Sequence, residues 1–299
     1  MKLLRLGEFG LIKRIKETVG RMPHAVEGIG DDAAVLPWTE KEDLLFTTDM
    51  ILEDVHFTLK GATPFDIGWK ALGVNLSDIA AMGGLPLYAV VALGAPVKLP
   101  VTFYDHLIWG MKVLGQRFDT LIVGGDTDRS EKLIVSIALL GKVERQNAVL
   151  RSGSRVGDIL CVTGTLGGSR KGKHLSFIPR LLEARCLVKH FRPSAMIDVS
   201  DGVASDVRRI CEESGVGALV EGSAIPLSKG VTVKEALTDG EDFELLFTLP
   251  PQKASRLLRK KELLKCPVTA IGKIVPQKSG IHLRTAKGTV SLKEPIHHF

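Results

Sequence analysis

Short apolar runs alternate with segments of helical periodicity along the whole chain, and many of the runs end in glycine and aspartate. In the first half, strand-like runs cover residues 44–50, 87–97, 120–128 and 132–143, and helix-like segments cover 69–83 and 103–118. Such alternation is typical of sheets that are covered by helices. We therefore predict an α/β (α+β) fold with mixed β-sheets.

The second half of the chain continues this pattern. Strands are expected at 159–164, 195–201 and 244–250, helices at 177–191 and 202–214, and a helix and a hairpin at the end. Between the halves, the stretch RSGSRVGD (151–158) is polar and glycine-rich, as linkers are. We predict an N-terminal domain over residues 1–148 and a C-terminal domain over residues 149–299.

The first residues, MKLLRLGEFGLIKRIKETVG, carry apolar side chains at helical spacing that charges interrupt. They predict an amphipathic helix packed on the core, not a signal peptide. The longest apolar run, 87–97, is much shorter than the roughly 20 residues of a membrane helix. The cysteines, which form no CxxC pair, are Cys161, Cys186, Cys211 and Cys266. We expect a cytoplasmic protein without a membrane partner.

The chain is basic, with a net charge of +6, but only 5% of its residues are aromatic. No arginine–aromatic stripe accompanies the charge, and base-stacking platforms need aromatic side chains. Nucleic acid is therefore not expected as a partner.

Carboxylates recur at strand ends, next to glycine, serine or threonine: Asp31, Asp32, Asp49, Asp78, Asp126, Asp128, Asp198, Asp201, Glu241 and Asp242. Each alone also fits a helix cap or a turn. Ligands of α/β sheets bind at strand ends, however, and small neighbours let the backbone approach them. Converging carboxylates need cations, and Mg²⁺ prefers oxygen ligands that it shares with phosphates. Calcium or manganese fits the same ligands.

The stretch GGSRKGKH (167–174) matches the GxxxxGK spacing of a phosphate-binding P-loop. His174 stands where the P-loop has the hydroxyl that binds magnesium, so a P-loop is not expected. Its basic residues, Arg170, Lys171 and Lys173, are interpreted as part of a solvated loop or as phosphate contacts within another fold.

Several motifs, taken together and in order, resemble the thiamine-monophosphate kinase family of the aminoimidazole ribonucleotide synthetase-like superfamily. They are GEFGLI, GIGDDAAV, TTDM with VHF, KALGVNLSDIAAMG, GGDT, VTGTLGGS, IDVSDG and GEDFELLF, and they span nearly the whole chain. The resemblance implies a two-domain fold whose N-terminal domain binds ATP and Mg²⁺ and forms a homodimer. It also implies ATP-dependent phosphorylation of thiamine monophosphate to thiamine diphosphate.

The resemblance assigns roles to single residues. It implies magnesium ligands at Asp32, Thr47, Thr48, Asp49, Asp78, Asp126, Asp198 and Asp201. It implies ATP contacts at Gly125, Asp126, Arg151 and Ser200, and substrate contacts at His56, Glu241 and Phe299. No general base is expected, because an acceptor phosphate with a second pKa near 6 is already ionised at neutral pH. Catalysis then comes from in-line positioning and from cations that screen the repulsion of two anions.

Two features depart from the family pattern: the segment after VTGTLGGS is short, and the tail VSLKEPIHHF holds no aromatic residue before Phe299. An aminoimidazole ribonucleotide synthetase-type enzyme and a non-catalytic ATP-binding regulatory protein therefore stay open as alternatives. Selenophosphate synthetase needs a reactive cysteine near the N-terminus, whereas the first cysteine here is Cys161. The hydrogenase-maturation member ends in a cysteine-containing tail, which this chain lacks.

Overall fold

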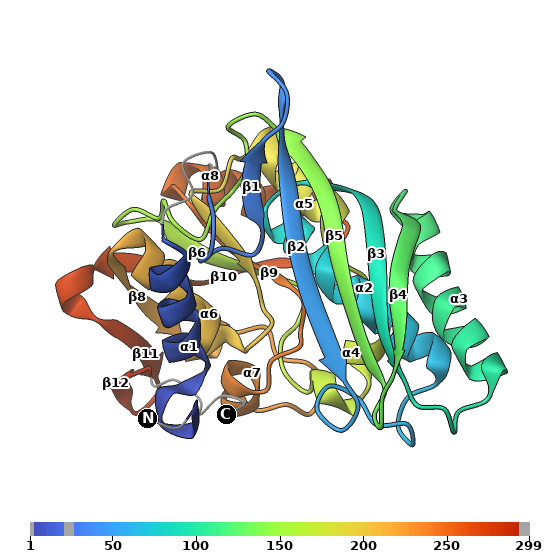
Figure 1. The fold of residues 1–299 in the computed structure, drawn as a ribbon. Coiled ribbons are helices and arrows are strands. Elements are labelled where there is room, and N and C mark those ends of the chain that lie inside the picture. Colours follow the sequence, from blue (N-terminus) through green and yellow to red (C-terminus); the bar gives the residue numbers. More distant parts are fainter. Residues whose placement is uncertain (1–2, 21–26, 293–299) are drawn as a thin grey trace.

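The computed structural model describes residues 3–20 and 27–292, which build two β-sheets (Figure 1). The first sheet has the order β1-β2-β5-β3-β4, with β1 Ala34–Pro37, β2 Glu42–Leu52, β3 Leu85–Ala95, β4 Leu121–Arg129 and β5 Ile134–Glu144. Its β3–β4 pair is parallel and its other pairs are antiparallel. The predicted class, mixed β-sheets covered by helices, is confirmed.

The second sheet has the order β12-β11-β8-β10-β6-β9-β7. Its strands are β6 Ile159–Thr163, β7 Ala195–Asp198, β8 Val216–Glu221, β9 Leu245–Leu249, β10 Val268–Pro276, β11 Ile281–Thr285 and β12 Gly288–Ser291. The α-helices are α1 Leu3–Val19, α2 Pro64–Ala81, α3 Val101–Arg117, α4 Lys173–Ser176, α5 Leu181–His190, α6 Val203–Ser214, α7 Val233–Thr238 and α8 Pro251–Arg259.

Helix α2 lies at the centre of the molecule. A capping box between Thr63 and Asp66 fixes its start, and most of its side chains are buried against the first sheet, α3 and α5. The crossing of α2 with α3 is close: a Cβ on Gly68 would lie 1.9 Å from the carbonyl oxygen of Leu107. Glycine is therefore required at this crossing, and α2 has a fixed position between the two halves.

The second sheet carries helices on both faces. Strand β6 shows why, since its residues alternate between two clusters: Leu160 and Val162 pack with Val207 of α6, while Cys161 faces the cluster that contains Leu187 of α5. This double cover buries the sheet and brings the end of β7 close to α2.

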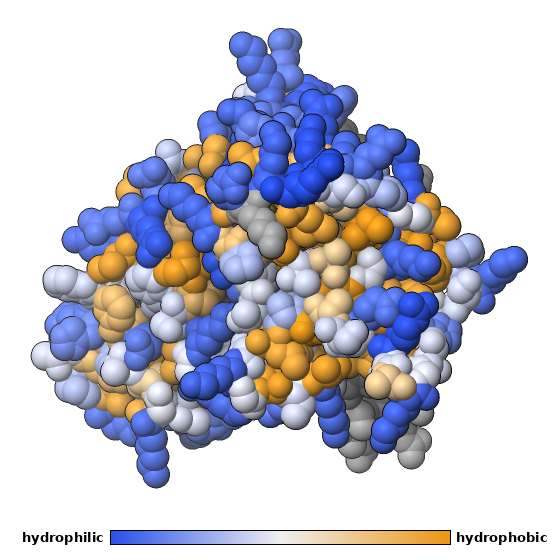
Figure 2. Space-filling model, turned by 180° about the vertical axis from the view of Figure 1, so that it is seen from behind, coloured by the Kyte–Doolittle hydropathy of each residue, from blue (hydrophilic) through white to orange (hydrophobic). Residues whose placement is uncertain are grey.

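Within residues 3–20 and 27–292, no helix covers the face of the first sheet that is turned to the viewer in Figure 1. Large apolar side chains of its strands are 44–60% exposed: Phe46, Met50, Tyr88, Val90, Leu121 and Val123. The opposite side of the molecule, in Figure 2, shows apolar side chains interrupted by charged ones. An uncovered face with many exposed apolar side chains, such as that of the first sheet, is typical of an interaction surface.

Helix α1 is confirmed, but its second half, whose burial the structure describes, is exposed where the prediction expected packing on the core. Ile12, Ile15 and Val19 are each at least 38% exposed, although their spacing is that of one helix face. None of the α1 residues whose burial is described belongs to either of the two buried apolar clusters.

The stretch 167–174 forms a 3₁₀ turn, η1 (Ser169–Lys171), and the first two residues of the four-residue helix α4. The long helix that follows a P-loop is not formed here, as expected. None of the helices in the described ranges is long and apolar enough to cross a membrane.

Candidate active site

A cavity of about 390 Å³ lies where the two halves of the chain meet. Strand β2 and helix α2 contribute side chains from the first half, and the loop between β7 and α6 contributes side chains from the second half. Most of the predicted site residues line it: Asp32, Thr47, Thr48, Asp49, His56, Asp78, Arg151, Asp198, Ser200, Asp201 and Glu241.

Helix α2 and the outer edge of strand β2 direct these side chains toward the cavity. Helix α2 turns Lys70, Val74 and Asp78 toward the cavity, because residues four apart share one helix face. Strand β2 is partnered by β1 only over Asp43–Phe46. From Thr47 onward its outer edge has no strand partner within the described ranges, and the cavity lies along this edge.

Three carboxylates converge in the cavity. Asp32, Asp78 and Asp198 each bring one oxygen within 4.8 Å of the others. Thr47 Oγ1 donates a hydrogen bond to Asp78 Oδ2, and Ser77 Oγ donates one to Asp198 Oδ2, both at 2.5 Å. Asp32 Oδ2 is buried and has no hydrogen-bond partner in the described part of the chain. Hard oxygen donors with an unsatisfied buried oxygen fit a divalent cation such as Mg²⁺.

The raised pKa values of the carboxylates in this cavity also indicate a cation site. Burial and the charge of Asp32 raise the pKa of Asp198 to about 8. Burial, followed by Asp32 and Asp201, raises the pKa of Asp49 to about 6. Burial and the charges of Asp49 and Asp198 hold the pKa of Asp78 well above its usual value. The protein alone therefore does not compensate all of these negative charges.

Asp31 has a role different from that of its neighbour. Its Oδ1 accepts a hydrogen bond from the backbone N–H of Asp32, and its Oδ2 accepts one from the backbone N–H of Arg151, both at 3.0 Å. Burial and Asp32 raise its pKa to about 7. Asp31 thus fixes the backbone that presents Asp32 and Arg151 to the cavity.

Two arginines balance part of the negative charge. Arg151 Nη2 lies 2.6 Å from Asp32 Oδ1. Arg209 of α6 pairs with Asp201 and, at 3.2 Å, with Asp206. Arg209 was not among the predicted site residues, although it stands three residues after Asp206 on α6, a spacing at which helix side chains meet.

A second cavity, of about 340 Å³, adjoins the first, and His56 and Glu241 line both. These two residues form the boundary between the cavities, and Lys70, which sequence reasoning also missed, contacts both of them. Its Nζ donates hydrogen bonds to Glu241 Oε1 at 2.6 Å and to the carbonyl oxygen of His56 at 2.7 Å. A lysine inside the apolar run WKALGV was the available signal, since an unpaired lysine is almost never fully buried.

Gly125 and Asp126 lie elsewhere, in the exposed strand β4. Asp126 of β4 lies opposite Ala92 of β3, and Ala92 lies opposite Ser136 of β5. Ser136 in turn lies opposite Met50 of β2. Three strand spacings, roughly 14 Å, thus separate it from β2. Gly125 and Asp126 are outside the cavity of their own chain.

Phe299, the remaining predicted substrate contact, lies outside the described residues.

Two family models match the chain: the N-terminal domain of AIR synthase related proteins over residues 30–143, and their C-terminal domain over residues 163–283. Thiamine-monophosphate kinase of Aquifex aeolicus is 36% identical over 291 residues, which cover 88% of this chain and 92% of the relative. Thiamine-monophosphate kinase of Bacillus subtilis is 34% identical and covers 98% of this chain and 100% of the relative.

The solved structures agree with these matches. The structure of AaThiL complexed with AMPPCP and TMP has a TM-score of 0.84 and 34% identity, and covers 100% of this chain and 99% of that one. The hydrogenase maturation protein HypE, at 19% identity and a TM-score of 0.70, shares the fold. By sequence and by fold, the chain belongs to the thiamine-monophosphate kinase family of AIR synthase related proteins.

Proposed function

We propose that this protein phosphorylates thiamine monophosphate to thiamine diphosphate with ATP, by direct in-line transfer. The convergence of Asp32, Asp78 and Asp198 beside a second cavity carries the proposal, because it provides a place for phosphates held by cations next to a place for an acceptor. Full-length relatives named for this activity support it. A relative with similar fold was solved with AMPPCP and TMP.

The proposed metal is Mg²⁺, held by carboxylate and threonine oxygens: Asp32, Thr47, Thr48, Asp49, Asp78, Asp198 and Asp201. When bound, it neutralises phosphate charge and orients the transferring group. The hydroxyls of Thr47 and Thr48 each donate a hydrogen bond, to Asp78 Oδ2 and to the carbonyl oxygen of Ile137, and each keeps lone pairs for a cation. Arg151 and Ser200, which line the same cavity, are the proposed ATP contacts.

The chain's own residues then align two anions. His56 and Glu241 stand at the boundary of the two cavities and are proposed to hold the acceptor there. An acceptor phosphate oxygen attacks the γ-phosphorus of ATP, the bond from that phosphorus to the β,γ-bridging oxygen breaks, and ADP leaves. No protein base is needed, because the attacking oxygen is already ionised near neutral pH.

We also propose a homodimer formed through the uncovered face of the first sheet. In the described part of the chain, β4 and the part of β2 from Thr47 onward each have an edge without a strand partner. A two-fold arrangement that places β4 of one copy along the open edge of β2 of the other satisfies both edges and buries the exposed apolar face. It brings Gly125 and Asp126 of the second copy to the cavity of the first. The predicted ATP and metal contacts on β4 are thus proposed to act across the dimer.

The location proposed for this enzyme is the cytoplasm. All four cysteines are free thiols, which is usual in a reducing compartment.

ADP release with ATP, Mg²⁺ and thiamine monophosphate tests the function. We expect ADP formation that stops with EDTA, and no ADP formation with formylglycinamidine ribonucleotide as acceptor. ATP binding without ADP release on any acceptor would instead identify a non-catalytic protein.

A further inference from the structure

The second cavity is formed by two segments of the chain. The loop 54–62 supplies one wall, and residues 170–175 supply the other. Because His56 and Glu241 also line the first cavity, the second cavity opens directly onto the acidic site. A molecule that fills the second cavity can therefore place one end next to the proposed phosphates.

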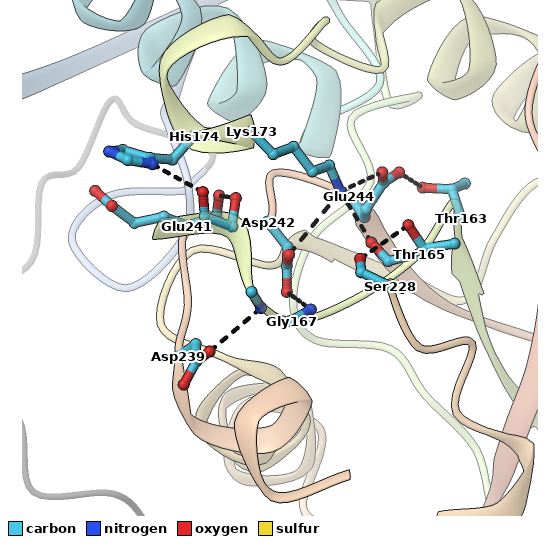
Figure 3. A network of polar contacts seen from close by, with 12 residues as sticks. Thr163, Thr165, Gly167, Lys173, His174, Ser228, Asp239, Glu241, Asp242 and Glu244 are labelled. Carbon is cyan, nitrogen blue, oxygen red and sulfur yellow. Dashed lines mark hydrogen bonds and ion pairs between the residues drawn. The ribbon is translucent and has the colours of Figure 1, made fainter. Parts of the chain in front are cut away.

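The backbone on both sides of residue 170 is held in place (Figure 3). Before it, Ser169 Oγ donates to the carbonyl oxygen of Glu241 at 2.6 Å. After it, Lys173 Nζ lies 3.1 Å from Glu244 Oε1, and His174 Nδ1 lies 2.8 Å from the carbonyl oxygen of Ser169. The segment that carries residue 170 is thus fixed to the strand-β9 side of the site.

Further contacts in the same view strengthen this attachment. The backbone N–H of Gly167 donates to Asp242 Oδ2 at 2.8 Å, and that of Gly168 donates to Asp239 Oδ2 at 3.2 Å. The segment is short, but its position against residues 239–244 is well defined.

The charges that line the second cavity are balanced, with one exception. Glu241 pairs with the buried Lys70 at 2.6 Å, and Lys171 lies 3.8 Å from Glu235. Burial, followed by the charge of Lys70, lowers the pKa of His174, which favours its neutral imidazole.

Arg170 is the exception. It is exposed, it lines the cavity, and it makes no ion pair or hydrogen bond within residues 3–20 and 27–292. Its charge contributes to the lowered pKa of His174, which lines the same cavity. One uncompensated cation on the wall of a cavity is suited to an anionic group.

We propose that Arg170 binds the phosphate of the acceptor and selects phosphorylated over unphosphorylated acceptors. This inference rests on the proposed function and assigns a residue to it. The guanidinium would contact phosphate oxygens other than the attacking one, leaving that oxygen to form the bond to the γ-phosphorus. Arginine suits this role because its planar fork matches two phosphate oxygens at once.

The binding of unphosphorylated thiamine distinguishes a contact with the acceptor phosphate from a general effect of Arg170 on acceptor binding. Thiamine carries the positive charge of the thiazolium ring but no phosphate, so a phosphate contact predicts that Arg170 contributes nothing to its binding. Removal of the guanidinium should leave thiamine affinity unchanged or make it higher, because one like charge is lost.

The test compares Arg170→Gln with the wild type by steady-state kinetics and by calorimetry with thiamine monophosphate and with thiamine. We expect the KM and the Kd for thiamine monophosphate to rise roughly 10- to 100-fold, as for the loss of a charged hydrogen bond. The KM for ATP should stay the same, and the Kd for thiamine should stay the same or fall. Lys229→Gln is the matched control, because Lys229 is an exposed cation that lines neither cavity, and it should change none of these values. Arg170→Lys should recover part of the loss.

Two results would overturn the inference: an unchanged KM for thiamine monophosphate in Arg170→Gln, or an equal loss of thiamine binding. A raised KM for ATP alone would also overturn it, by assigning Arg170 to the nucleotide. A wild-type protein that does not phosphorylate thiamine monophosphate is a different failure, since it contradicts the proposed function itself.

Discussion

The ammonium nitrogen of Lys70 lies 2.6 Å from Oε1 of Glu241, and the lysine side chain is fully buried. The same nitrogen donates to the carbonyl oxygen of His56. One side chain of α2 therefore holds both residues of the boundary between the two cavities, and two helical turns further on the same helix presents Asp78 to the acidic site.

Replacing Lys70 by methionine should destabilise the protein strongly. It leaves the partly buried carboxylate of Glu241 without its partner, and breaking a buried pair costs about 3–5 kcal/mol of the free energy of unfolding. The matched control is Lys132→Met, whose partner Asp54 is as exposed as the lysine, 55% each. Its loss should be about 0–1 kcal/mol. Urea denaturation of both variants measures the difference, and equal losses would contradict this view of the boundary.

The stability of the metal-free protein should depend on pH in a defined direction. The pKa of Asp198 is raised from 3.8 to about 8, and that of Asp49 from 3.8 to about 6. Between pH 3.8 and about pH 8, the folded state therefore binds more protons than the unfolded state. Its free energy of unfolding is highest below about pH 4 as far as these groups are concerned, and falls as pH rises toward 8.

Mg²⁺ should remove most of this dependence, because it replaces the protons as the compensating charge. Thermal unfolding in EDTA and in Mg²⁺, over a pH series, measures both effects. Stability in EDTA that increases from pH 5 to pH 8, with no added stability from Mg²⁺ at pH 8, would argue against a cation site.

Placing a charge on the uncovered sheet face should separate the dimer. Val90→Arg introduces a guanidinium into a surface that two copies are proposed to share, where it repels its symmetry mate. The control is Val97→Arg, since Val97 is 75% exposed and lies beyond the end of β3. Light scattering should give a dimer mass for the wild type and Val97→Arg and a monomer mass for Val90→Arg. A monomeric wild type would contradict the proposed assembly.

Mixing two inactive variants should restore activity. Asp78→Asn and Asp126→Asn should each abolish turnover without unfolding the chain. If Asp126 acts across the dimer, a mixed dimer has one intact site, and exchanged subunits should recover about a quarter of the wild-type activity.

The control mixture is Asp78→Asn with Asp198→Asn, because both residues line the same cavity of one chain. No activity should return there. An Asp126→Asn variant with normal turnover would remove β4 from the site altogether.

Much of the architecture could be predicted from apolar periodicity. The runs that became β2, β3, β4, β5 and β6 were placed within a few residues, and the start of α2 was missed because residues 64–68 depend on the cap at Thr63. Strand β8 was missed too, since its six residues include a glycine and lie between more strongly patterned segments. The exposure of α1 could not be predicted, because periodicity defines an apolar face but not what covers it.

The sequence could predict which residues form the site, but not the partners and distances that the fold gives them. Motif resemblance brought Asp32, Asp78 and Asp198 together although they lie far apart in the sequence. It did not identify Lys70 or Arg209, whose roles depend on partners that only the folded chain brings near. The distance of Asp126 from β2 follows from strand order, which no local pattern encodes.

The most direct test of the account uses ATP whose γ-phosphoryl group carries heavy oxygen. With thiamine monophosphate and Mg²⁺, the account predicts thiamine diphosphate whose terminal phosphoryl group carries the label, and none after Asp78→Asn. Unlabelled product, or ADP released without thiamine diphosphate, would contradict direct transfer from ATP to the acceptor phosphate at this site.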